Sequence, residues 1–285
     1  MNIIITGSNG FIGSRLLEIL SNYKKYKILN LVRSKPSKFY NKNIKFLRCN
    51  LNRLSNQASQ IIKFKPDALI HLAWDNIPNF SYKNSKKNKN TSINLIKFFE
   101  KNTKIKNIII SGSCFELYPP NNSYKYFKDA KNKILDFVKL RSKNKKFIFQ
   151  WLRIFYVFGP KQRKQALIPH LISSISNRKK LVLNAPNFKH DFIYVDDVCN
   201  CIIKCLNKNI GSNIFEVGNG KTIKVKKILE IIEQLKSKKI TLDYSEKKTN
   251  QNFKARITKL KRKLNWKPNT PIINGIKKVI KLSKI

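Results

Sequence analysis

The sequence predicts an α/β fold, in which a doubly wound parallel sheet is followed by a smaller C-terminal α/β lobe. Through the first 160 residues, short apolar runs alternate with amphipathic helical patterns. Parallel strands require this alternation because a helix must return the chain between them. Three glycines also separate the first apolar run from the first helical pattern, which is typical of the first turn of such a sheet.

The elements of this core follow in order along the chain. Residues 11–22 have the period of a helix and place Ile12, Leu16 and Leu20 on one face. The remaining helices are expected at 57–64, 84–102 and 123–140, and the strands at 2–6, 27–33, 43–48, 67–72, 107–111 and 147–155. These segments place the core at residues 1–160.

Beyond Gly159 and Pro160 the alternation becomes less regular. Residues 161–285 are therefore predicted to form the smaller lobe, with segments that return to the core. Residues 269–285 are basic and amphipathic, and we expect them to form an ordinary surface helix.

Composition limits the class of protein. Of the 285 residues, 41% are hydrophobic, which is enough for a packed core, and no apolar run approaches the roughly 20 residues that span a bilayer. The five cysteines are an odd number with no zinc-like spacing, so we predict neither a disulfide framework nor a metal site. A cytoplasmic protein is expected.

The charge is extreme: 60 Lys and Arg against 15 Asp and Glu give +45. Lysines occur in nearly every surface-like segment rather than in one stripe, so we attribute the charge to composition. We expect nonspecific binding to polyanions at low salt and no specific nucleic-acid partner.

The segment from Thr6 to Gly13 carries Gly7, Gly10 and Gly13 between a strand and a helix. A tight turn needs a residue that tolerates positive φ, a pyrophosphate needs close approach of the backbone, and the start of a helix offers free N–H groups. The segment therefore predicts a Rossmann-like site for a dinucleotide.

The end of the second strand distinguishes between the two nicotinamide dinucleotides. An acidic side chain there accepts a hydrogen bond from the ribose 2′-hydroxyl of NAD, whereas a basic one favours the 2′-phosphate of NADP. Arg33 stands at this point, and no Asp or Glu occurs between Glu18 and Asp67. NADP is the predicted cofactor, and NAD remains open because Arg33 could also be solvated or stack on adenine.

The predicted reaction centre combines Ser113, at the end of a strand, with Tyr124 and Lys128 at the start of a helix. The i, i+4 spacing puts the phenol and the ammonium on one helical face, where the positive charge lowers the pKa of the phenol. Such a phenol exchanges a proton with a sugar hydroxyl or ketone while hydride moves to or from nicotinamide, and Ser113 can bond the same oxygen. Tyr126 is excluded because Ala130 stands at the matching position.

These and further motifs resemble the extended short-chain dehydrogenase/reductase family, which contains nucleotide-sugar epimerases, dehydratases and reductases. The resemblance covers almost the whole chain. It comprises Thr6 to Gly13, Asp67 to Ala73, the set of Ser113, Tyr124 and Lys128, Leu152 to Phe155, Phe158 to Pro160, His190 to Val198, and Leu264 to Pro268.

The resemblance implies roles for residues at matching positions. Those that would hold the dinucleotide are Gly7, Gly10, Phe11, Ile12 and Gly13, with Leu72, Ala73 and Trp74 beside the nicotinamide ribose, Lys128 on its hydroxyls and Asn88 as a structural residue. Those that would contact the nucleotide-sugar diphosphate or close the site are Tyr156, Gln162, His190 and Asp191. Tyr156 and His190 depart from the Asn and Arg that many relatives carry. Asn50 replaces an acidic residue of the family and could still bind adenine.

The resemblance and the residues together predict an NAD(P)-dependent oxidoreductase that reduces a 4-keto-6-deoxy sugar nucleotide, in polysaccharide biosynthesis. A 4-epimerase is the alternative, and a homodimer is left open. A 4,6-dehydratase is disfavoured because Cys114 and Phe115 stand where that group carries an Asp-Glu pair, and no role is assigned to Glu116. From another class, a non-catalytic NADP-binding or RNA-binding protein on the same fold remains an alternative.

Overall fold

The structure is a computed structural model that describes residues 1–34, 41–144, 147–177, 181–183, 185–240, 242–244 and 252–282. It divides into two compact units. Unit 1 comprises Met1–Ile154 and Cys201–Phe215, and unit 2 comprises Phe155–Asn200 and Glu216–Ile285. The predicted boundary after residue 160 stays a prediction. Among the described residues, no helix is both long and apolar enough to cross a membrane.

Unit 1 contains a seven-stranded sheet in the order β11-β6-β5-β4-β1-β2-β3. The strands are β1 (Asn2–Thr6), β2 (Lys27–Val32), β3 (Ile44–Arg48), β4 (Ala68–His71), β5 (Asn107–Ser113), β6 (Ile148–Ile154) and β11 (Asn213–Val217). All neighbours from β6 to β3 pair in parallel. The predicted doubly wound α/β fold is confirmed.

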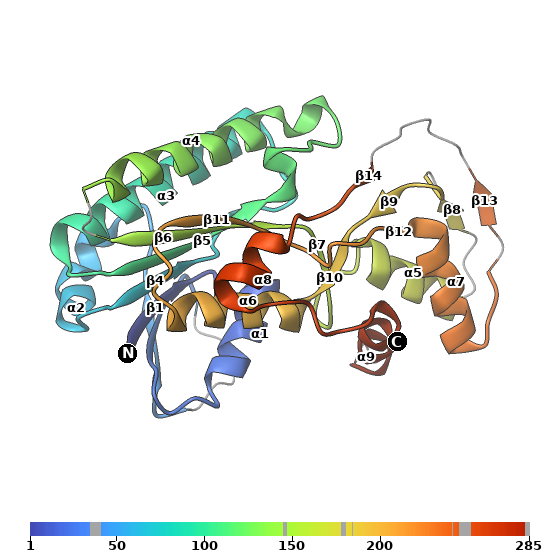
Figure 1. The fold of residues 1–285 in the computed structure, drawn as a ribbon, viewed down its shortest axis with the longest axis horizontal. Coiled ribbons are helices and arrows are strands. Elements are labelled where there is room, and N and C mark those ends of the chain that lie inside the picture. The colour runs from blue at the N-terminus through green and yellow to red at the C-terminus, as the bar shows by residue number, and fades with distance from the viewer. Residues whose placement is uncertain are drawn as a thin grey trace. The chain divides into compact units, whose positions relative to one another are not determined.

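Helices connect these strands. They are α1 (Phe11–Leu20), α2 (Ala58–Lys63), α3 (Tyr82–Asn102) and α4 (Lys125–Ser142), with 3-10 turns at Leu54–Gln57, Cys114–Glu116 and Asn122–Tyr124. Figure 1 shows α3 and α4 side by side over one face of the sheet, with α1 on the other face. The buried faces of α3 and α4 supply Phe99 and Leu135, which pack in one cluster with Trp151 of β6. The sheet is therefore covered on both faces, as a parallel sheet requires.

One strand was not expected from the sequence. β11 lies beside β6 at the edge of the sheet, although 147–155 is the last strand that the sequence predicts for the core. Its five residues carry only a short apolar run and follow a helix outside the regular alternation. Periodicity alone could not assign such a strand to this sheet.

The strand order places the functional edge of unit 1. The chain runs outward from β1 through β2 and β3, then resumes with β4 on the other side of β1. Ligands of doubly wound sheets bind at the carboxyl ends of the strands where the order reverses. The segments after β1, β2, β4 and β5 therefore form the edge at which a ligand is expected.

Unit 2 consists of short strands and helices. Its elements are β7 (Tyr156–Phe158), α5 (Leu167–Ser176), β8 (Leu181–Leu183), β9 (Lys189–His190), β10 (Phe192–Tyr194), α6 (Val195–Asn207), which extends into unit 1, β12 (Ile223–Lys224), α7 (Val225–Lys236), β13 (Leu242–Tyr244), β14 (Asn252–Phe253), α8 (Thr258–Leu264) and α9 (Ile272–Leu282). β7 pairs with β10, β9 pairs with β12 and β14, and β8 pairs with β13. The predicted C-terminal helix is present as α9, and residues 283–285 lie outside the described residues.

Asp197 lies in the first turn of α6, and its side chain and carbonyl bind the segment before α9. Its carboxylate accepts the backbone N–H groups of Asn269 and Thr270, at 2.9 and 3.1 Å. The indole of Trp266 donates to its carbonyl at 3.2 Å. Asp197 therefore fastens the segment that leads into α9, a partnership that only the folded chain reveals.

Candidate functional site

The glycine loop after β1 leaves no room for side chains. Gly7 has φ +79°, and a Cβ there would lie 2.6 Å from the backbone nitrogen of Ala73. A Cβ on Gly13 would overlap the carbonyl oxygen of Gly7. The loop closes through a hydrogen bond from Gly10 N to Gly7 O, at 3.0 Å, and α1 begins directly after it. The backbone alone shapes this turn, which is the requirement for close approach of a phosphate.

Two buried polar atoms beside the loop have no hydrogen-bond partner among the described residues. They are the Ser8 hydroxyl oxygen and the Trp74 indole nitrogen. A buried polar group without a partner costs free energy, and a bound molecule with donors and acceptors relieves that cost. The loop and these two atoms fit a dinucleotide.

The end of β2 carries Arg33, whose side chain is 78% exposed and forms an ion pair with Asp75 at 2.9 Å. The sequence shows no nearby acidic residue, but the fold brings Asp75 from the segment after β4. A carboxylate that opposes a phosphate therefore lies at this site, although the stretch of sequence around Arg33 contains none. Asn50, in the turn after β3, accepts the N–H of Asn52 at 3.0 Å.

The segment after β4 is held by α3. Asn88 is buried and accepts the N–H of Asp75 at 2.6 Å, which agrees with its expected structural role. Leu72 donates its N–H to Thr6 O at 3.1 Å, so this segment runs beside the glycine loop. Leu72, Ala73 and Trp74 are half-buried, and their predicted contact with the nicotinamide side stays a prediction.

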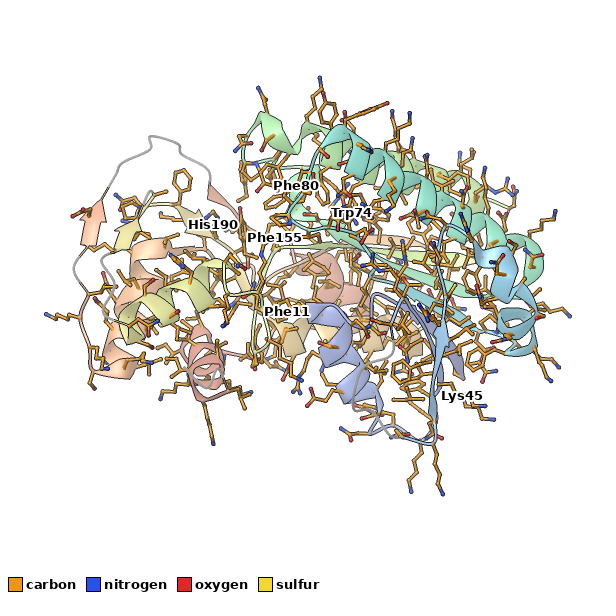
Figure 2. The ribbon with its side chains drawn as sticks, turned by 180° about the vertical axis from the view of Figure 1, so that it is seen from behind. Phe11, Lys45, Trp74, Phe80, Phe155 and His190 are labelled. Carbon is orange, nitrogen blue, oxygen red and sulfur yellow. The ribbon has the colours of Figure 1, made fainter. Side chains whose placement is uncertain are left out.

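Tyr124 is the last residue of the 3-10 turn Asn122–Tyr124 and directly precedes α4. Its ring packs between those of Phe80 and Phe115, with centroids 4.7 and 4.8 Å away. Trp74 and Phe80, both labelled in Figure 2, pack against Phe127. These contacts fix the phenol ring beside the segments that follow β4 and β5.

Ser113 ends β5, and its hydroxyl oxygen accepts the N–H of Phe115 at 3.2 Å. That bond uses an acceptor site and leaves the hydroxyl proton available to donate. Because Phe115 contacts Tyr124, the structure brings Ser113 and Tyr124 to the same part of unit 1. Lys128 lies one turn further along α4 and is half-buried.

The residue that sequence reasoning missed here is Glu116. It is buried, and its carboxylate accepts the N–H of Ser113 at 2.7 Å. The same carboxylate accepts from the Trp151 indole and the Arg153 guanidinium, both at 2.9 Å. Trp151 and Arg153 stand two apart on β6 and so share a face, which is the signal that could have indicated a buried carboxylate. Glu116 fixes the end of β5 that carries Ser113.

A second residue was missed on α4. Lys131 is buried, donates to Ser111 O at 2.7 Å, and lies 4.2 Å from the centre of the Trp74 ring. Burial lowers the pKa of its ammonium to about 8, while the carboxylate of Glu116 acts in the opposite direction. Lys131 therefore connects α4 to β5 and to the segment after β4.

His71, at the end of β4, is a hydrogen-bonded core residue. Its two ring nitrogens lie 2.7 Å from the Thr6 hydroxyl and 2.9 Å from the Ser92 hydroxyl. Burial, together with the charge of Lys131, lowers its pKa to about 3. The imidazole is therefore neutral near pH 7.

In unit 2, Tyr156 of β7 stacks on His190 of β9, with centroids 4.1 Å apart. Burial lowers the pKa of His190 to about 4, so this ring is uncharged near neutral pH. An arginine at this position would carry a permanent positive charge, which the uncharged His190 does not supply. Gln162 donates to Val157 O at 2.9 Å.

Asp191 is fully buried. Its carboxylate accepts the N–H groups of Asn219, Gly220 and Ala255, at 2.5, 2.9 and 2.8 Å. Burial raises its pKa, and these hydrogen bonds lower it by less. Asp191 thus ties three separate segments of unit 2 together. The predicted contacts of Tyr156, Gln162, His190 and Asp191 with a substrate stay predictions.

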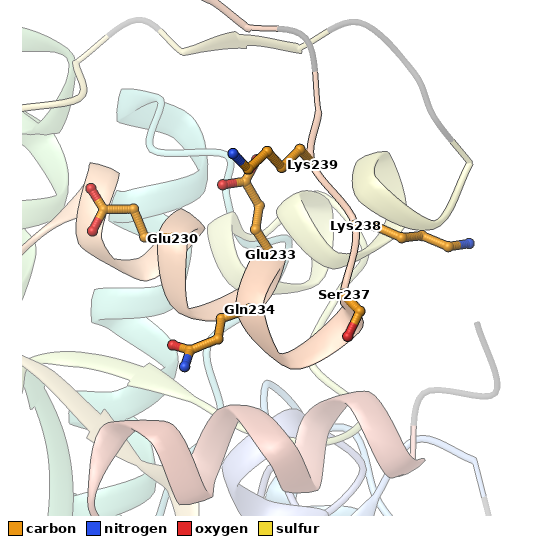
Figure 3. Close-up of a pocket in the computed structure, with 6 residues that line it drawn as sticks. All are labelled: Glu230, Glu233, Gln234, Ser237, Lys238 and Lys239. Atoms are coloured by element: carbon orange, nitrogen blue, oxygen red, sulfur yellow. The ribbon is translucent and has the colours of Figure 1, made fainter.

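A surface hollow lies beside the C-terminal end of α7 (Figure 3), and none of the candidate site residues lines it. Its lining consists of Glu230, Glu233, Gln234, Ser237, Lys238 and Lys239. Glu233 accepts the N–H of Ile240 at 3.0 Å, so its carboxylate holds the segment that follows α7. We assign no function to this hollow.

The model of one protein family, described as the NAD dependent epimerase/dehydratase family, matches residues 3–218. The chain belongs to this family. The match begins in β1 and ends after β11, so it includes the glycine loop, the Ser113 and Tyr124 segments, and the first part of unit 2. The predicted resemblance is thereby confirmed.

Three curated relatives show the range of enzymes to which the chain is similar. It is 28% identical to a CDP-abequose synthase of Salmonella muenchen over 47% of each chain. It is 31% identical to a dTDP-4-dehydro-6-deoxyglucose reductase of Escherichia coli, over 46% of this chain and 43% of the relative. It is 34% identical to a UDP-glucuronate 4-epimerase of Thermodesulfobacterium geofontis, over 47% and 42%. The matches span about half the length of these relatives.

The fold is similar over its full length to that of a UDP-glucose 4-epimerase from Thermotoga maritima, solved with UDP-glucose. The TM-score is 0.86 at 19% identity, covering 100% of this chain and 99% of the other. At this identity the likeness concerns the fold. It agrees with the predicted sheet and C-terminal lobe.

Proposed function

We propose that this chain is an NAD(P)-dependent oxidoreductase that reduces the C4 ketone of a nucleotide-activated 6-deoxy sugar. The observation that carries the proposal is the arrangement around α4. Tyr124 is fixed by two aromatic rings beside the segment that bears Ser113, and Lys128 follows one turn later, in α4. The phenol of Tyr124 is thus a proton donor, and the Ser113 hydroxyl lies in the same part of unit 1, at the edge of the sheet where the glycine loop lies.

The chemistry assigned to these residues is acid catalysis of a ketone reduction. A bound, reduced dinucleotide supplies hydride. Tyr124 gives its proton to the ketone oxygen, so that the ketone becomes a secondary alcohol, and the phenolate then regains a proton from solvent. Ser113 donates a hydrogen bond to the same oxygen, and Lys128 stabilises the phenolate form of Tyr124.

The residues that follow Ser113 support reduction over dehydration. Elimination of water between C5 and C6 requires a further acid and base next to Ser113, and the next two residues are Cys114 and Phe115. The carboxylate of Glu116 accepts hydrogen bonds from Ser113, Trp151 and Arg153, so we do not assign it the role of that acid or base. The relatives that make or reduce 6-deoxy sugar nucleotides point in the same direction.

NADPH is the proposed donor because Arg33 stands at the end of β2, where a guanidinium favours a 2′-phosphate. Cytoplasmic location stays a prediction, and homodimer formation stays open. A 4-epimerase is the second candidate, and the 34% identical UDP-glucuronate 4-epimerase favours it. An epimerase keeps its NAD bound, since the hydride that it removes is returned in the same cycle.

The test is the cofactor content of the purified protein, followed by turnover. We expect an empty site that fills with added NADPH, and oxidation of NADPH when a nucleotide 4-keto-6-deoxyhexose is supplied. Retained NAD with interconversion of UDP-hexoses at C4 would instead establish the epimerase. Failure to bind either dinucleotide would contradict both candidates.

A further inference from the structure

The ion pair between Arg33 and Asp75 connects the two strands that flank β1. Arg33 directly follows β2, and Asp75 lies in the segment after β4. In the sheet, β1 lies between these strands. The 2.9 Å contact therefore joins the two sides of the carboxyl edge at which the glycine loop begins.

Asp75 is the fixed member of this pair. Its N–H binds Asn88 at 2.6 Å, and its carbonyl accepts from Asn84 and Asn88 at 3.1 and 3.3 Å. Its second carboxylate oxygen binds Lys87 at 3.1 Å. The Asp75 side chain is 20% exposed against 78% for Arg33. Asp75 is thus held by α3 on both backbone groups and on its side chain, whereas Arg33 extends into solvent.

The two cofactors make different demands on this pair. A ribose 2′-hydroxyl leaves Arg33 bound to Asp75. A 2′-phosphate can displace the Asp75 carboxylate from the Arg33 guanidinium, which breaks the ion pair. It can also bind Arg33 together with Asp75, and its negative charge then lies close to that of the carboxylate. In both cases Asp75 disfavours the phosphate and leaves the hydroxyl unaffected.

We propose that Asp75 is a cofactor-specificity residue, whose carboxylate competes with the 2′-phosphate for Arg33. The ratio of NADPH to NADH affinity is then set by the Arg33–Asp75 pair and not by Arg33 alone. This inference rests on the proposed function in one respect, namely that the edge of unit 1 binds a dinucleotide.

The test is direct binding of NADPH and NADH, followed by quenching of tryptophan fluorescence or by calorimetry and without any substrate. In Asp75→Asn, NADPH should bind at least fivefold more tightly, and NADH affinity should change less than twofold. In Arg33→Gln, NADPH should bind more weakly. Adding Asp75→Asn to Arg33→Gln should then tighten NADPH binding by less than Asp75→Asn does alone, because the guanidinium for which both anions compete is absent.

Asp136→Asn is the matched control. Asp136 also pairs with a basic side chain, Lys139 at 3.5 Å, and its replacement changes the net charge equally. It lies on α4 twelve residues beyond Tyr124, about 18 Å along a helix. We expect both affinities to remain unchanged in this variant.

Three outcomes would overturn the inference. Equal tightening of both cofactors in Asp75→Asn, or the same tightening in Asp136→Asn, would show a general effect of charge. An unchanged ratio in Asp75→Asn, with both dinucleotides still bound, would contradict this inference alone. Binding of neither dinucleotide by the unsubstituted protein would contradict the proposed function as well.

Discussion

The two units use their buried carboxylates differently. In unit 1, Glu116 binds one backbone N–H and two side chains of the neighbouring strand, and so positions the end of β5. In unit 2, Asp191 binds three backbone N–H groups from segments far apart in the sequence. The first arrangement positions Ser113 at the edge of a continuous seven-stranded sheet. The second holds together a unit built from short strands.

Both units bury polar atoms without partners among the described residues. Beside the glycine loop of unit 1 these are the Ser8 hydroxyl and the Trp74 indole, and in unit 2 they include the Gln162 side-chain oxygen. The Asp191 carboxylate of unit 2, by contrast, accepts three backbone N–H groups. Substitutions near the loop should therefore alter cofactor binding and chemistry, whereas loss of Asp191 should first alter stability.

The largest effect is expected from Gly13→Ala. The added methyl group would overlap the carbonyl oxygen of Gly7, which belongs to the backbone and cannot rotate away. We expect dinucleotide affinity to fall by at least about 100-fold, since phosphate binding depends on close backbone approach. Titration with NADPH and NADH measures this.

Gly211→Ala is the control for the glycine substitution. Gly211 also lies in unit 1 and has φ +69°, but a Cβ there meets nothing within 4 Å. The variant should lose only about 1 kcal/mol through backbone strain and keep its dinucleotide affinity. Similar affinity losses in both variants would show that the glycine loop has no special role.

Asp191→Ala tests the other side of the comparison. Removing the carboxylate leaves three N–H groups without their acceptor, one buried and two partly buried, so the free energy of unfolding should fall by about 2 to 4 kcal/mol. Denaturant titration measures the loss, and dinucleotide affinity at low temperature should stay within threefold. A stable variant with normal folding but weakened dinucleotide binding would contradict this division of roles.

Acid should destabilise unit 1 through His71. The pKa of His71 in the folded protein is about 3, against an ordinary value of 6.5 for histidine. The unfolded chain therefore binds more protons between these values, and stability falls as the pH drops through that window. Lowering the pH from 7 to 4 should cost about 3 kcal/mol from this residue, and His71→Gln should remove that part of the slope.

His190 provides the comparison in unit 2. Its pKa is lowered to about 4, so its contribution has the same sign over a narrower window. Denaturant titrations at several pH values should show that His190→Gln removes a smaller part of the total stability loss between pH 7 and pH 3 than His71→Gln does. If the free energy of unfolding depended on pH equally in His71→Gln and in the unsubstituted protein, the neutral, buried state of His71 would be contradicted.

The smallest effect is expected from the net charge of +45. Charges spread over a surface are screened within about 8 Å at physiological ionic strength. Affinity for nucleic acid should fall steeply between about 50 and 200 mM salt, while kcat with saturating substrates changes little. Polynucleotide binding that kept its affinity and sequence preference over that range would show a functional basic surface.

The sequence could predict those parts of the site that depend on neighbours in the chain. Gly7, Gly10 and Gly13 lie in the loop after β1 and the start of α1, and Tyr124 and Lys128 lie four positions apart at the start of α4, so spacing alone relates them. The partnerships of Asp75 with Arg33 and of Glu116 with Arg153 join residues about 40 positions apart. They depend on strand order, which periodicity does not determine, and β11 was missed for the same reason.

The central claim is that Tyr124 delivers the proton in a reaction at the edge of unit 1. The most direct measurement is single-turnover oxidation of NADPH by a nucleotide 4-keto-6-deoxyhexose, in Tyr124→Phe and in the control Tyr126→Phe. Tyr126 lies on the same helix, is 45% exposed and packs on Tyr82. We predict a loss of at least about 100-fold in Tyr124→Phe, with NADPH affinity within a few-fold, and normal turnover in Tyr126→Phe. Turnover of Tyr124→Phe within tenfold of the unsubstituted protein would contradict the claim.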